Sequence, residues 1–263
     1  MKWSDVREIV QLGISNVQTA VKPASNAALT RPFGQQNLHH KDEHMCGRIA
    51  NTMPTDAMAQ LFAASPNNDL PDVPNYNICP TNSVHTVTLG EGNRRLEPMR
   101  WGFIPTWYKK PNDGPLLINA RAETIAEKPA FKEACRARRC VIVATGFYEW
   151  TKDEDGGRNP WYIARRDGAP IAFAGIWQSW ENGETHLKTC AIVTTGSNTA
   201  ISAIHHRMPV LLEPDQIALW LGEKGKGVAT LMRAAPEETL QFHRVSWEVN
   251  SRVSSGPQLQ LPF

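Results

Sequence analysis

The stretch Cys140-Val141-Ile142-Val143-Ala144-Thr145-Gly146-Phe147-Tyr148-Glu149-Trp150 decides the fold, because it holds two short apolar runs separated by a Thr-Gly turn. β-branched and aromatic residues of this kind fit a pleated, half-buried strand. Similar runs follow at residues 161–165, 171–177 and 187–195. Short strands punctuated by turns do not form βαβ units. The sequence therefore predicts an α+β fold in which curved antiparallel β-sheets form a barrel-like core, flanked by several short helices.

The remaining elements are placed by turn and cap signals. Gly90-Glu91-Gly92-Asn93 separates apolar runs at 84–89 and 96–101, which predicts a hairpin. A helix is expected at 55–64 with Thr55 as its cap, and another at 129–136. Later helices are expected at 198–204, 215–221 and 227–234, with a last strand near 242–249 and a loop at 254–257.

Composition excludes several classes of protein. The chain has 263 residues, of which 41% are hydrophobic and nine are tryptophan, so it can bury a sizeable core. No run approaches the roughly 18 apolar residues of a transmembrane helix, and the first residues lack a signal-peptide core. A cytoplasmic protein is therefore expected. The net charge of +2 does not indicate a nucleic-acid partner, so any such binding must depend on a local groove.

The cysteines indicate neither a disulfide framework nor a structural zinc site. There are five of them, an odd number, and no two have the Cys-x-x-Cys spacing. We expect most to be reduced thiols in the core or on the surface, and the sequence offers no convincing metal site. They are Cys46, Cys79, Cys135, Cys140 and Cys190.

Residues 1–44 differ in composition from the rest of the chain. Residues 1–20 are compatible with a weakly amphipathic helix, and residues 21–44 form a linker-like segment rich in Pro, Ala, Asn, Gln and His. The pattern of a compact domain begins at residue 45. We therefore expect an N-terminal extension at 1–44 and a single domain at 45–263.

Met45-Cys46-Gly47-Arg48 resembles the start of a protein although it lies inside this one. Removal of the methionine would leave Cys46 with a free α-amine. An amine with a pKa of about 8 and a thiol with a pKa of about 8.5 can together close a five-membered ring on an aldehyde. The alternative is that the tetrapeptide is only the beginning of a strand.

Three polar clusters are candidates for a site. Asn119 could orient a carbonyl or a nucleophile through its amide, and Arg121 could hold a phosphate. Glu149 lies among aromatic residues on the face of Phe147, where loss of water would raise its pKa toward the range of general acid–base catalysis. His205 next to Arg207 could supply a proton beside an anion-binding guanidinium.

Each cluster also has a structural interpretation. The segment after Asn119 could be an Asx turn that closes a strand, Glu149 could be an edge-strand residue facing water, and one of the two histidines at 205 and 206 could be only a surface residue. The loop from Trp101 to Trp107 is a fourth candidate. Exposed indoles stack on unpaired bases, which contributes about 1–3 kcal/mol per base, although core packing is expected for at least one of the two.

Taken together, Met-Cys-Gly-Arg, Asn-Ala-Arg-Ala-Glu-Thr, Gly-Phe-Tyr-Glu-Trp and His-x-Arg-Met-Pro, in that order, resemble the SOS response-associated peptidase family. Its members are also called abasic site processing proteins. The resemblance covers Met45 to about Pro257. It implies a covalent crosslink to abasic sites in single-stranded DNA, in which the N-terminal cysteine ends as a thiazolidine and shields the lesion as part of the DNA damage response.

The resemblance also implies roles for particular residues, with no cofactor and no metal. Cys46 would be the nucleophile through its amine and thiol, and Asn119 would orient it. Glu149 would act as the acid–base group, and His205 would assist proton transfer or hold the sugar-phosphate. The implied DNA contacts are Arg48, Arg121 and Arg207 to phosphates, and Trp150 and Trp107 to bases. The expected partner is single-stranded DNA containing abasic sites, bound by a monomer that is nucleoid-associated when on DNA.

One departure from the family pattern matters. In the family the cysteine directly follows the initiator methionine, whereas here residues 1–44 would block its amine. Three explanations are open: a start assigned too far upstream, a propeptide cut before Cys46, or a permanently extended protein with altered chemistry. Two other functions also stay open. One is a cysteine peptidase that acts mainly on its own extension, and the other is a non-enzymatic single-strand binder.

Overall fold

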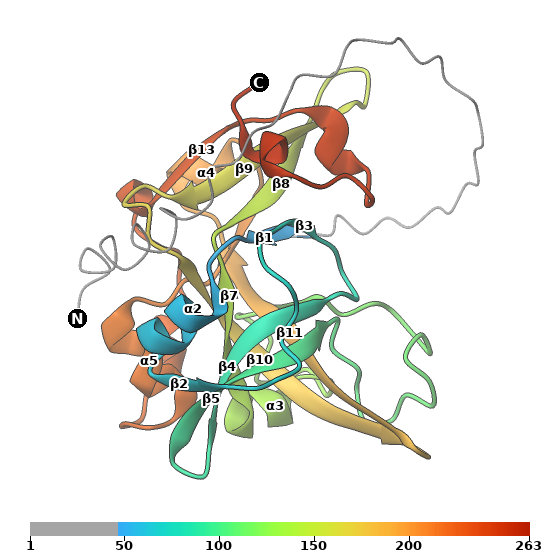
Figure 1. Ribbon diagram of the computed structural model, residues 1–263, viewed down its shortest axis with the longest axis vertical. Helices are drawn as coiled ribbons and strands as arrows, with labels where there is room; N and C mark the ends of the chain where they lie inside the picture. The colour runs from blue at the N-terminus through green and yellow to red at the C-terminus, as the bar shows by residue number, and fades with distance from the viewer. Residues whose placement is uncertain (1–46) are drawn as a thin grey trace.

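Two β-sheets form the frame of the structure, a computed structural model that describes residues 47–263 (Figure 1). The larger sheet has the strand order β12-β11-β10-β7-β4-β5-β2, with β6 paired to β11. Its strands are β2 (Ala64–Pro66), β4 (Ser83–Gly90), β5 (Asn93–Trp101), β6 (Asn119–Arg121), β7 (Arg139–Ala144), β10 (Ile171–Asn182), β11 (Thr185–Gly196) and β12 (Arg207–Pro209). The smaller sheet has the order β13-β9-β8-β1-β3, and its strands are β1 (Ile49–Asn51), β3 (Asn75–Ile78), β8 (Gly146–Lys152), β9 (Arg158–Arg165) and β13 (Leu240–Arg244).

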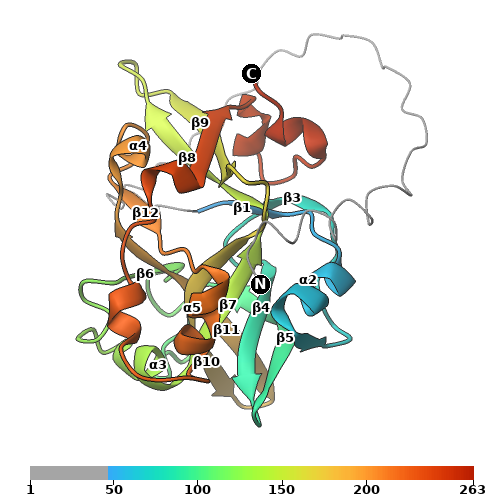
Figure 2. The same cartoon turned by 90° about the vertical axis from the view of Figure 1, so that its left-hand side faces the viewer.

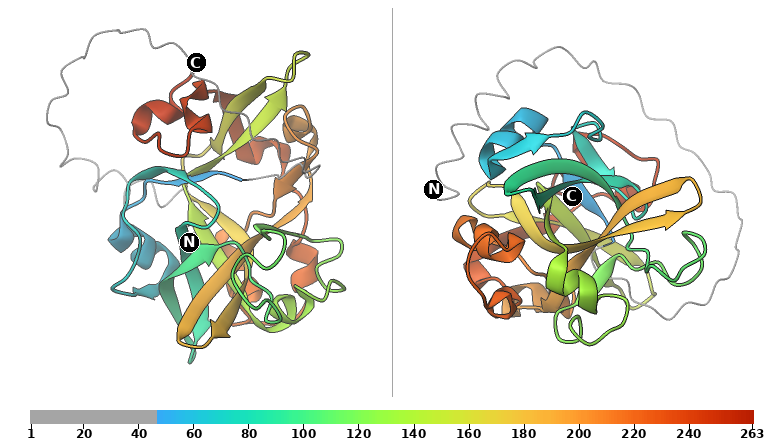
Figure 3. Two further views of the ribbon diagram at one scale, coloured as in Figure 1. Left: turned by 90° about the vertical axis from the view of Figure 1, so that its right-hand side faces the viewer. Right: turned by 90° about the horizontal axis from the view of Figure 1, so that it is seen from below.

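The larger sheet closes on itself. Most neighbours in it are antiparallel, but β11 also pairs with β5 in parallel, at Thr189↔Arg100 and Cys190↔Trp101. This pairing completes a ring of β4, β5, β11, β10 and β7, so the core is a mixed five-stranded barrel (Figure 3). The predicted barrel-like α+β fold is confirmed, with the correction that two of the pairings of β11 are parallel.

Short helices surround this barrel. The α-helices are α2 (Thr55–Phe62), α3 (Lys132–Ala137), α4 (Thr199–Ser202) and α5 (Pro214–Leu221). The 3₁₀ turns are η2 (Val228–Leu231), η3 (Glu237–Thr239), η4 (Trp247–Asn250) and η5 (Pro257–Gln260). The C-terminal segment with η4 and η5 lies against the smaller sheet, above the barrel (Figures 1 and 2).

The stretch from Cys140 to Trp150 joins the two sheets. Its first half is β7, a wall of the barrel that is buried on both sides. Val141 and Val143 pack in one core cluster with Phe62 and Trp220 from the flanking helices α2 and α5. Cys140, Ile142 and Ala144 pack in a second cluster with Trp101 and Phe173 inside the barrel. After the turn at Thr145 the chain enters β8, so one continuous segment belongs to both sheets.

Most predicted elements are confirmed, with shifted ends. The hairpin of β4 and β5 and the strands β7 to β11 lie where the pattern placed them, and β10 and β11 extend into one long hairpin. The helix cap at Thr55 is wrong, because Pro54 occupies the cap position and Thr55 is already helical. The helix expected at 227–234 is a single 3₁₀ turn. The last strand ends at Arg244, since Ser246 caps η4 by accepting a hydrogen bond from the Glu248 N–H.

The expectations for the N-terminal extension at 1–44, including a helix at 1–20, lie outside the described residues. Within residues 47–263, no helix has the length and apolar character that a membrane crossing requires.

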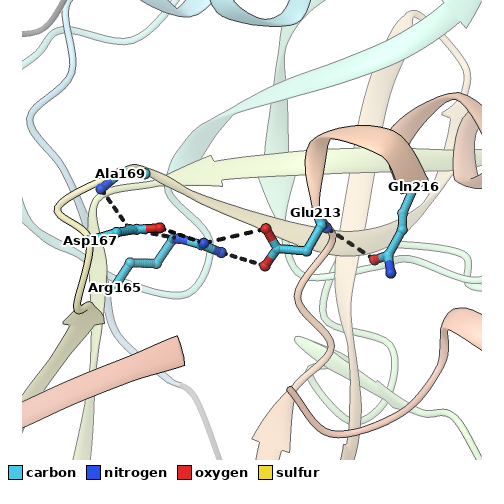
Figure 4. A network of polar contacts seen from close by, with 5 residues as sticks. All are labelled: Arg165, Asp167, Ala169, Glu213 and Gln216. Atoms are coloured by element: carbon cyan, nitrogen blue, oxygen red, sulfur yellow. Dashed lines mark hydrogen bonds and ion pairs between the residues drawn. The ribbon is translucent and has the colours of Figure 1, made fainter. Parts of the chain in front are cut away.

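A buried arginine ties the smaller sheet to helix α5 (Figure 4). Arg165, at the end of β9, donates to Asp167 at 2.7 Å and to Glu213 at 2.7 Å. Glu213 is also the cap residue of α5, and its backbone N–H donates to the Gln216 side chain at 3.0 Å. Because a buried guanidinium needs its carboxylates, this network fixes where α5 begins.

We expect Glu213→Ala to lower the free energy of unfolding by about 2 kcal/mol, because it removes a helix cap and a charged hydrogen bond at once. The measurement is urea unfolding. Glu238→Ala removes an exposed carboxylate in η3 and serves as the control. A loss at Glu213 no larger than that of the control would contradict the role of the network.

Candidate functional site

One apolar cluster lies beneath three of the predicted site residues. It contains Ile118, Phe147 and Ile204, all at most 7% exposed. Ile118 precedes Asn119, Phe147 shares the strand face of Glu149, and Ile204 precedes His205. The segments that carry Asn119, Glu149 and His205 therefore border the same apolar core.

Asn119 is held by the parallel pairing of β6 with β11. It lies opposite Ile192, and the Ile192 N–H donates to the Ile118 carbonyl at 3.0 Å. Asn119 begins this strand, and the turn follows only after Arg121. The alternative of an Asx turn directly after Asn119 is therefore wrong, because residues 119–121 form β6. The half-buried position of Asn119 at the start of a paired strand leaves little freedom to its backbone.

Glu149 is a buried carboxyl in the middle of a sheet. It is 2% exposed, lies opposite Trp161, and belongs to β8, which has β9 on one side and β1 on the other. The alternative of an edge-strand glutamate facing water is therefore excluded. This burial out of bulk water is the environment that the predicted acid–base role of Glu149 requires.

The tautomer of His205 follows from its contacts. Nδ1 lies 3.1 Å from the Arg207 backbone N and 3.3 Å from the Arg207 carbonyl O. Because a backbone N–H can only donate, the shorter contact needs a lone pair on Nδ1 and places the proton of the neutral ring on Nε2. The ring of His206 stacks on His205 with centroids 4.4 Å apart and is exposed. His206 is thus the surface member of the pair.

Arg207 forms a bidentate ion pair with Glu123, which the sequence reasoning missed. Its Nη1 and Nη2 lie 3.2 Å and 2.9 Å from the two carboxylate oxygens, and Nη2 also donates to the Thr194 carbonyl at 2.7 Å. The hydrogen bond from Arg207 lowers the pKa of Glu123. The pair joins the turn after β6 to β12, so it links the segment of Asn119 to that of His205. Glu123 was visible only as part of the motif at 119–124.

The other two predicted phosphate contacts differ in exposure. Arg121 is exposed at the end of β6, opposite Thr194. Arg48 is 8% exposed, and its Nη1 donates to the Asn77 side chain at 2.5 Å and to the Val249 carbonyl at 2.6 Å. Burial is the main reason why the pKa of Arg48 is lowered. Arg48 thus ties β1 to the C-terminal segment, in addition to any contact with a ligand.

The tryptophans separate into core and surface residues. Trp101 is fully buried, and its Nε1 donates to the Ile118 carbonyl at 3.0 Å. Trp107 is 56% exposed in the loop between β5 and β6. Trp150 is half-buried and lies on the face of β8 opposite to that of Glu149, because successive residues of a strand alternate in direction. Of Trp101 and Trp107, only Trp107 exposes its ring to solvent.

No described cysteine is an exposed nucleophile. Within residues 47–263 all four cysteines are free and buried, and burial raises the pKa of the Cys135, Cys140 and Cys190 thiols. Cys46 lies outside the described residues. The same part of the chain also contains no group of three or more His, Cys, Asp or Glu side chains that could hold a metal ion.

The chain is similar in sequence to known proteins over most of its length. Curated relatives include abasic site processing protein YoqW of Bacillus subtilis (strain 168), 34% identical over 222 residues, which span 82% of this chain and 98% of that protein. YedK of Escherichia coli (strain K12) is 31% identical, spanning 83% of this chain and all of its own length. HMCES of Pongo abelii is 30% identical, spanning 83% of this chain and 76% of its own.

Solved structures show the same fold. A protein from Bacteroides thetaiotaomicron aligns with a TM-score of 0.73 at 22% identity and covers 83% of this chain and 100% of its own. A phage-related protein from Bordetella bronchiseptica aligns with a TM-score of 0.61 at 27% identity, covering 80% and 99%. The family description SOS response associated peptidase (SRAP) matches residues 45–252. The chain therefore belongs to the SRAP family.

Proposed function

We propose that this protein recognises abasic sites in single-stranded DNA and forms a thiazolidine crosslink to them through Cys46, once Cys46 is the first residue of the chain. Three relatives at 30–34% identity carry the name abasic site processing protein. The observation that carries the proposal is the register of β1 with β8, which leads toward Gly47, the residue bonded to Cys46, on one strand and toward Glu149 on the other.

Backbone pairing defines this register. In the pairing of β1 with β8, Ile49 lies opposite Phe147 and Ala50 opposite Gly146. The Tyr148 N–H donates to the Arg48 carbonyl at 2.9 Å, which continues the antiparallel pattern beyond β1. Continued by one residue, this register leads to Gly47 and Glu149 as the next pair. It supports the proposal that a free amine on Cys46 reacts beside the buried Glu149 carboxyl.

The chemistry needs proton transfers and no oxidant. The amine nitrogen attacks the aldehyde carbon, and the carbonyl oxygen takes up a proton. Loss of that oxygen as water leaves an imine. The thiol sulfur then adds to the imine carbon, while a proton passes to the nitrogen, so that one water is released for each ring closed. Glu149 accepts and returns protons at the amine, and the Nε2 proton of His205 serves the departing oxygen.

The remaining groups hold the substrate. The side-chain amide of Asn119 orients the sugar or the nucleophile, and Arg121 and Arg207 bind phosphate oxygens. Trp107 offers an exposed indole to an unpaired base. In the free protein Arg207 is already fixed by Glu123 and Thr194. Binding of a phosphate to its guanidinium therefore costs little further side-chain conformational entropy.

The proposal requires that residues 1–45 be absent from the working protein. The family match begins at Met45, which supports a mature chain that starts at Cys46, by initiation at Met45 or by cleavage. The predicted domain at 45–263, without Met45, is then a single catalytic domain. In the extended chain the nitrogen of Cys46 is part of a peptide bond and cannot form an imine. The extended chain is therefore inactive in crosslinking.

Protein that begins at Cys46 is expected to form a heat-stable adduct with single-stranded DNA that contains one abasic site, and Cys46→Ala is expected to form none. Denaturing electrophoresis of the labelled oligonucleotide measures both. Cys135→Ala, which removes a buried thiol of α3, is the control and should react as the wild type does. An adduct of equal yield from Cys46→Ala would sink the proposal.

Glu149→Gln keeps the shape of the side chain but removes its ability to take up and release a proton. We expect it to slow crosslinking by roughly 10²–10⁴-fold. The rate is measured in single turnover with protein in excess. Glu97→Gln is the matched control, because Glu97 is a carboxyl of the barrel that is 7% exposed and bonded to Thr88 and Lys188. Equal rates for the two variants would contradict the role of Glu149.

A further inference from the structure

The side chain of Asn77, in β3, joins three segments of the chain. Its Oδ1 accepts a hydrogen bond from Arg48 Nη1 at 2.5 Å, just before β1. Its Nδ2 donates to the carbonyls of Ser251 and Ser254 at 2.9 Å and 2.7 Å. Asn77 is 7% exposed, so these partners take the place of water. The amide thus uses both of its N–H groups and its oxygen inside the protein.

The segment that Asn77 binds is packed against the smaller sheet. We call residues 246–260 the C-terminal strap, which includes η4 and η5 and lies beside β3 (Figure 2). Val249 and Leu259 of the strap are fully buried, and they share a small apolar cluster with Ala50 of β1 and Tyr148 of β8. The strap is therefore a fixed part of the fold that can hold other groups in place.

Adjacent residues of the strap contact the two strands that the proposed chemistry uses. The Val249 carbonyl accepts a hydrogen bond from Arg48 Nη1 at 2.6 Å. The next residue, Asn250, accepts one from Trp150 Nε1 at 2.6 Å. Trp150 directly follows Glu149 in β8. The strap thus ties the strand of the acid–base residue to the segment that leads to the nucleophile.

Arg48 is held through both its backbone and its side chain, two residues from Cys46. Its carbonyl accepts a hydrogen bond from the Tyr148 N–H at 2.9 Å. Its side chain is 8% exposed, so water does not readily replace a lost partner of the guanidinium. A buried polar group without an acceptor costs free energy, which favours the one position in which Arg48 reaches Asn77 and Val249 together.

We propose that Asn77 is a positioning residue for the crosslinking reaction. Its amide clamps Arg48 to the strap and so sets the direction in which the chain leaves β1 toward Cys46. The inference rests on the proposed function, because it takes Cys46 to be the nucleophile. A misplacement of about 1 Å between reacting groups can cost roughly 10²-fold in rate, so a contact two residues from the nucleophile is enough to control it.

The test uses protein that begins at Cys46 and single-stranded DNA with one abasic site, in single turnover over a range of protein concentrations. We expect Asn77→Ala to lower the maximal rate by roughly 10–100-fold. The protein concentration at half-maximal rate should stay the same, because the buried Asn77 side chain does not meet DNA. Asn82→Ala is the matched control and should react as the wild type does, since the Asn82 side chain accepts from the Cys79 N–H, in the turn after β3.

A second variant tests the route through Arg48. Asn77→Asp keeps an oxygen for the guanidinium but cannot donate to Ser251 and Ser254. It should therefore react faster than Asn77→Ala. The inference would be overturned by an Asn77→Asp variant that is no faster than Asn77→Ala, or by equal maximal rates for Asn77→Ala and Asn82→Ala. A change confined to the half-maximal concentration would also overturn it, because it would indicate a role in DNA binding instead.

Hydrogen exchange of the full chain without DNA separates this inference from the proposed function. Measured by mass spectrometry, exchange in Asn77→Ala should rise at residues 48–51 and 249–254 and stay unchanged in β7 of the barrel. Unchanged exchange in both segments would contradict the clamp. A rise in β7 as well would show a general loss of stability and overturn the inference. If the wild type forms no adduct, the proposed function fails, and the exchange still decides whether Asn77 holds Arg48 to the strap.

Discussion

The pairing of β11 with four other strands is the constraint on which the rest of the structure depends. Antiparallel pairing with β10 builds the long hairpin, and parallel pairing with β5 closes the barrel. β11 continues beyond the barrel. There it forms a parallel pair with β6 and an antiparallel pair with β12. Asn119 lies on β6, and His205 precedes β12 by two residues. One strand therefore sets the separation of two site segments that lie more than eighty residues apart in the chain.

The third segment reaches the site by another route. The chain leaves the barrel at the end of β7 and enters the smaller sheet as β8, which carries Glu149. Phe147 and Ile118 then pack in the same cluster, so the apolar side chains beneath the site join the two sheets. The ion pair of Glu123 with Arg207 crosses β11 at the same end and adds a polar tie. The side chains proposed to act on the aldehyde are thus supported by rigid strands.

Local sequence patterns predicted much of the fold, because the strands β4, β5 and β7 to β11 are long enough to show a strand pattern. Strands of three or four residues, such as β2, β3 and β12, were missed since they carry too few residues for periodicity. Barrel closure and the partner of Arg207 depend on contacts between distant segments, which no local pattern encodes. The burial of Glu149 was one of two open interpretations, and the surrounding strands decided between them. The burial of Arg48 against Val249 had no signal at all in the tetrapeptide that contains it.

The proposed function depends on Cys46 as an N-terminal nucleophile that closes a ring. The most direct test is mass spectrometry of the adduct after digestion of its DNA and protein parts, with and without borohydride treatment. The account predicts a modified peptide that begins at Cys46, with the mass of the deoxyribose fragment less one water, and no change on treatment because a thiazolidine has no imine left to reduce. Attachment at a lysine, or a gain of two hydrogens on borohydride treatment, would contradict it.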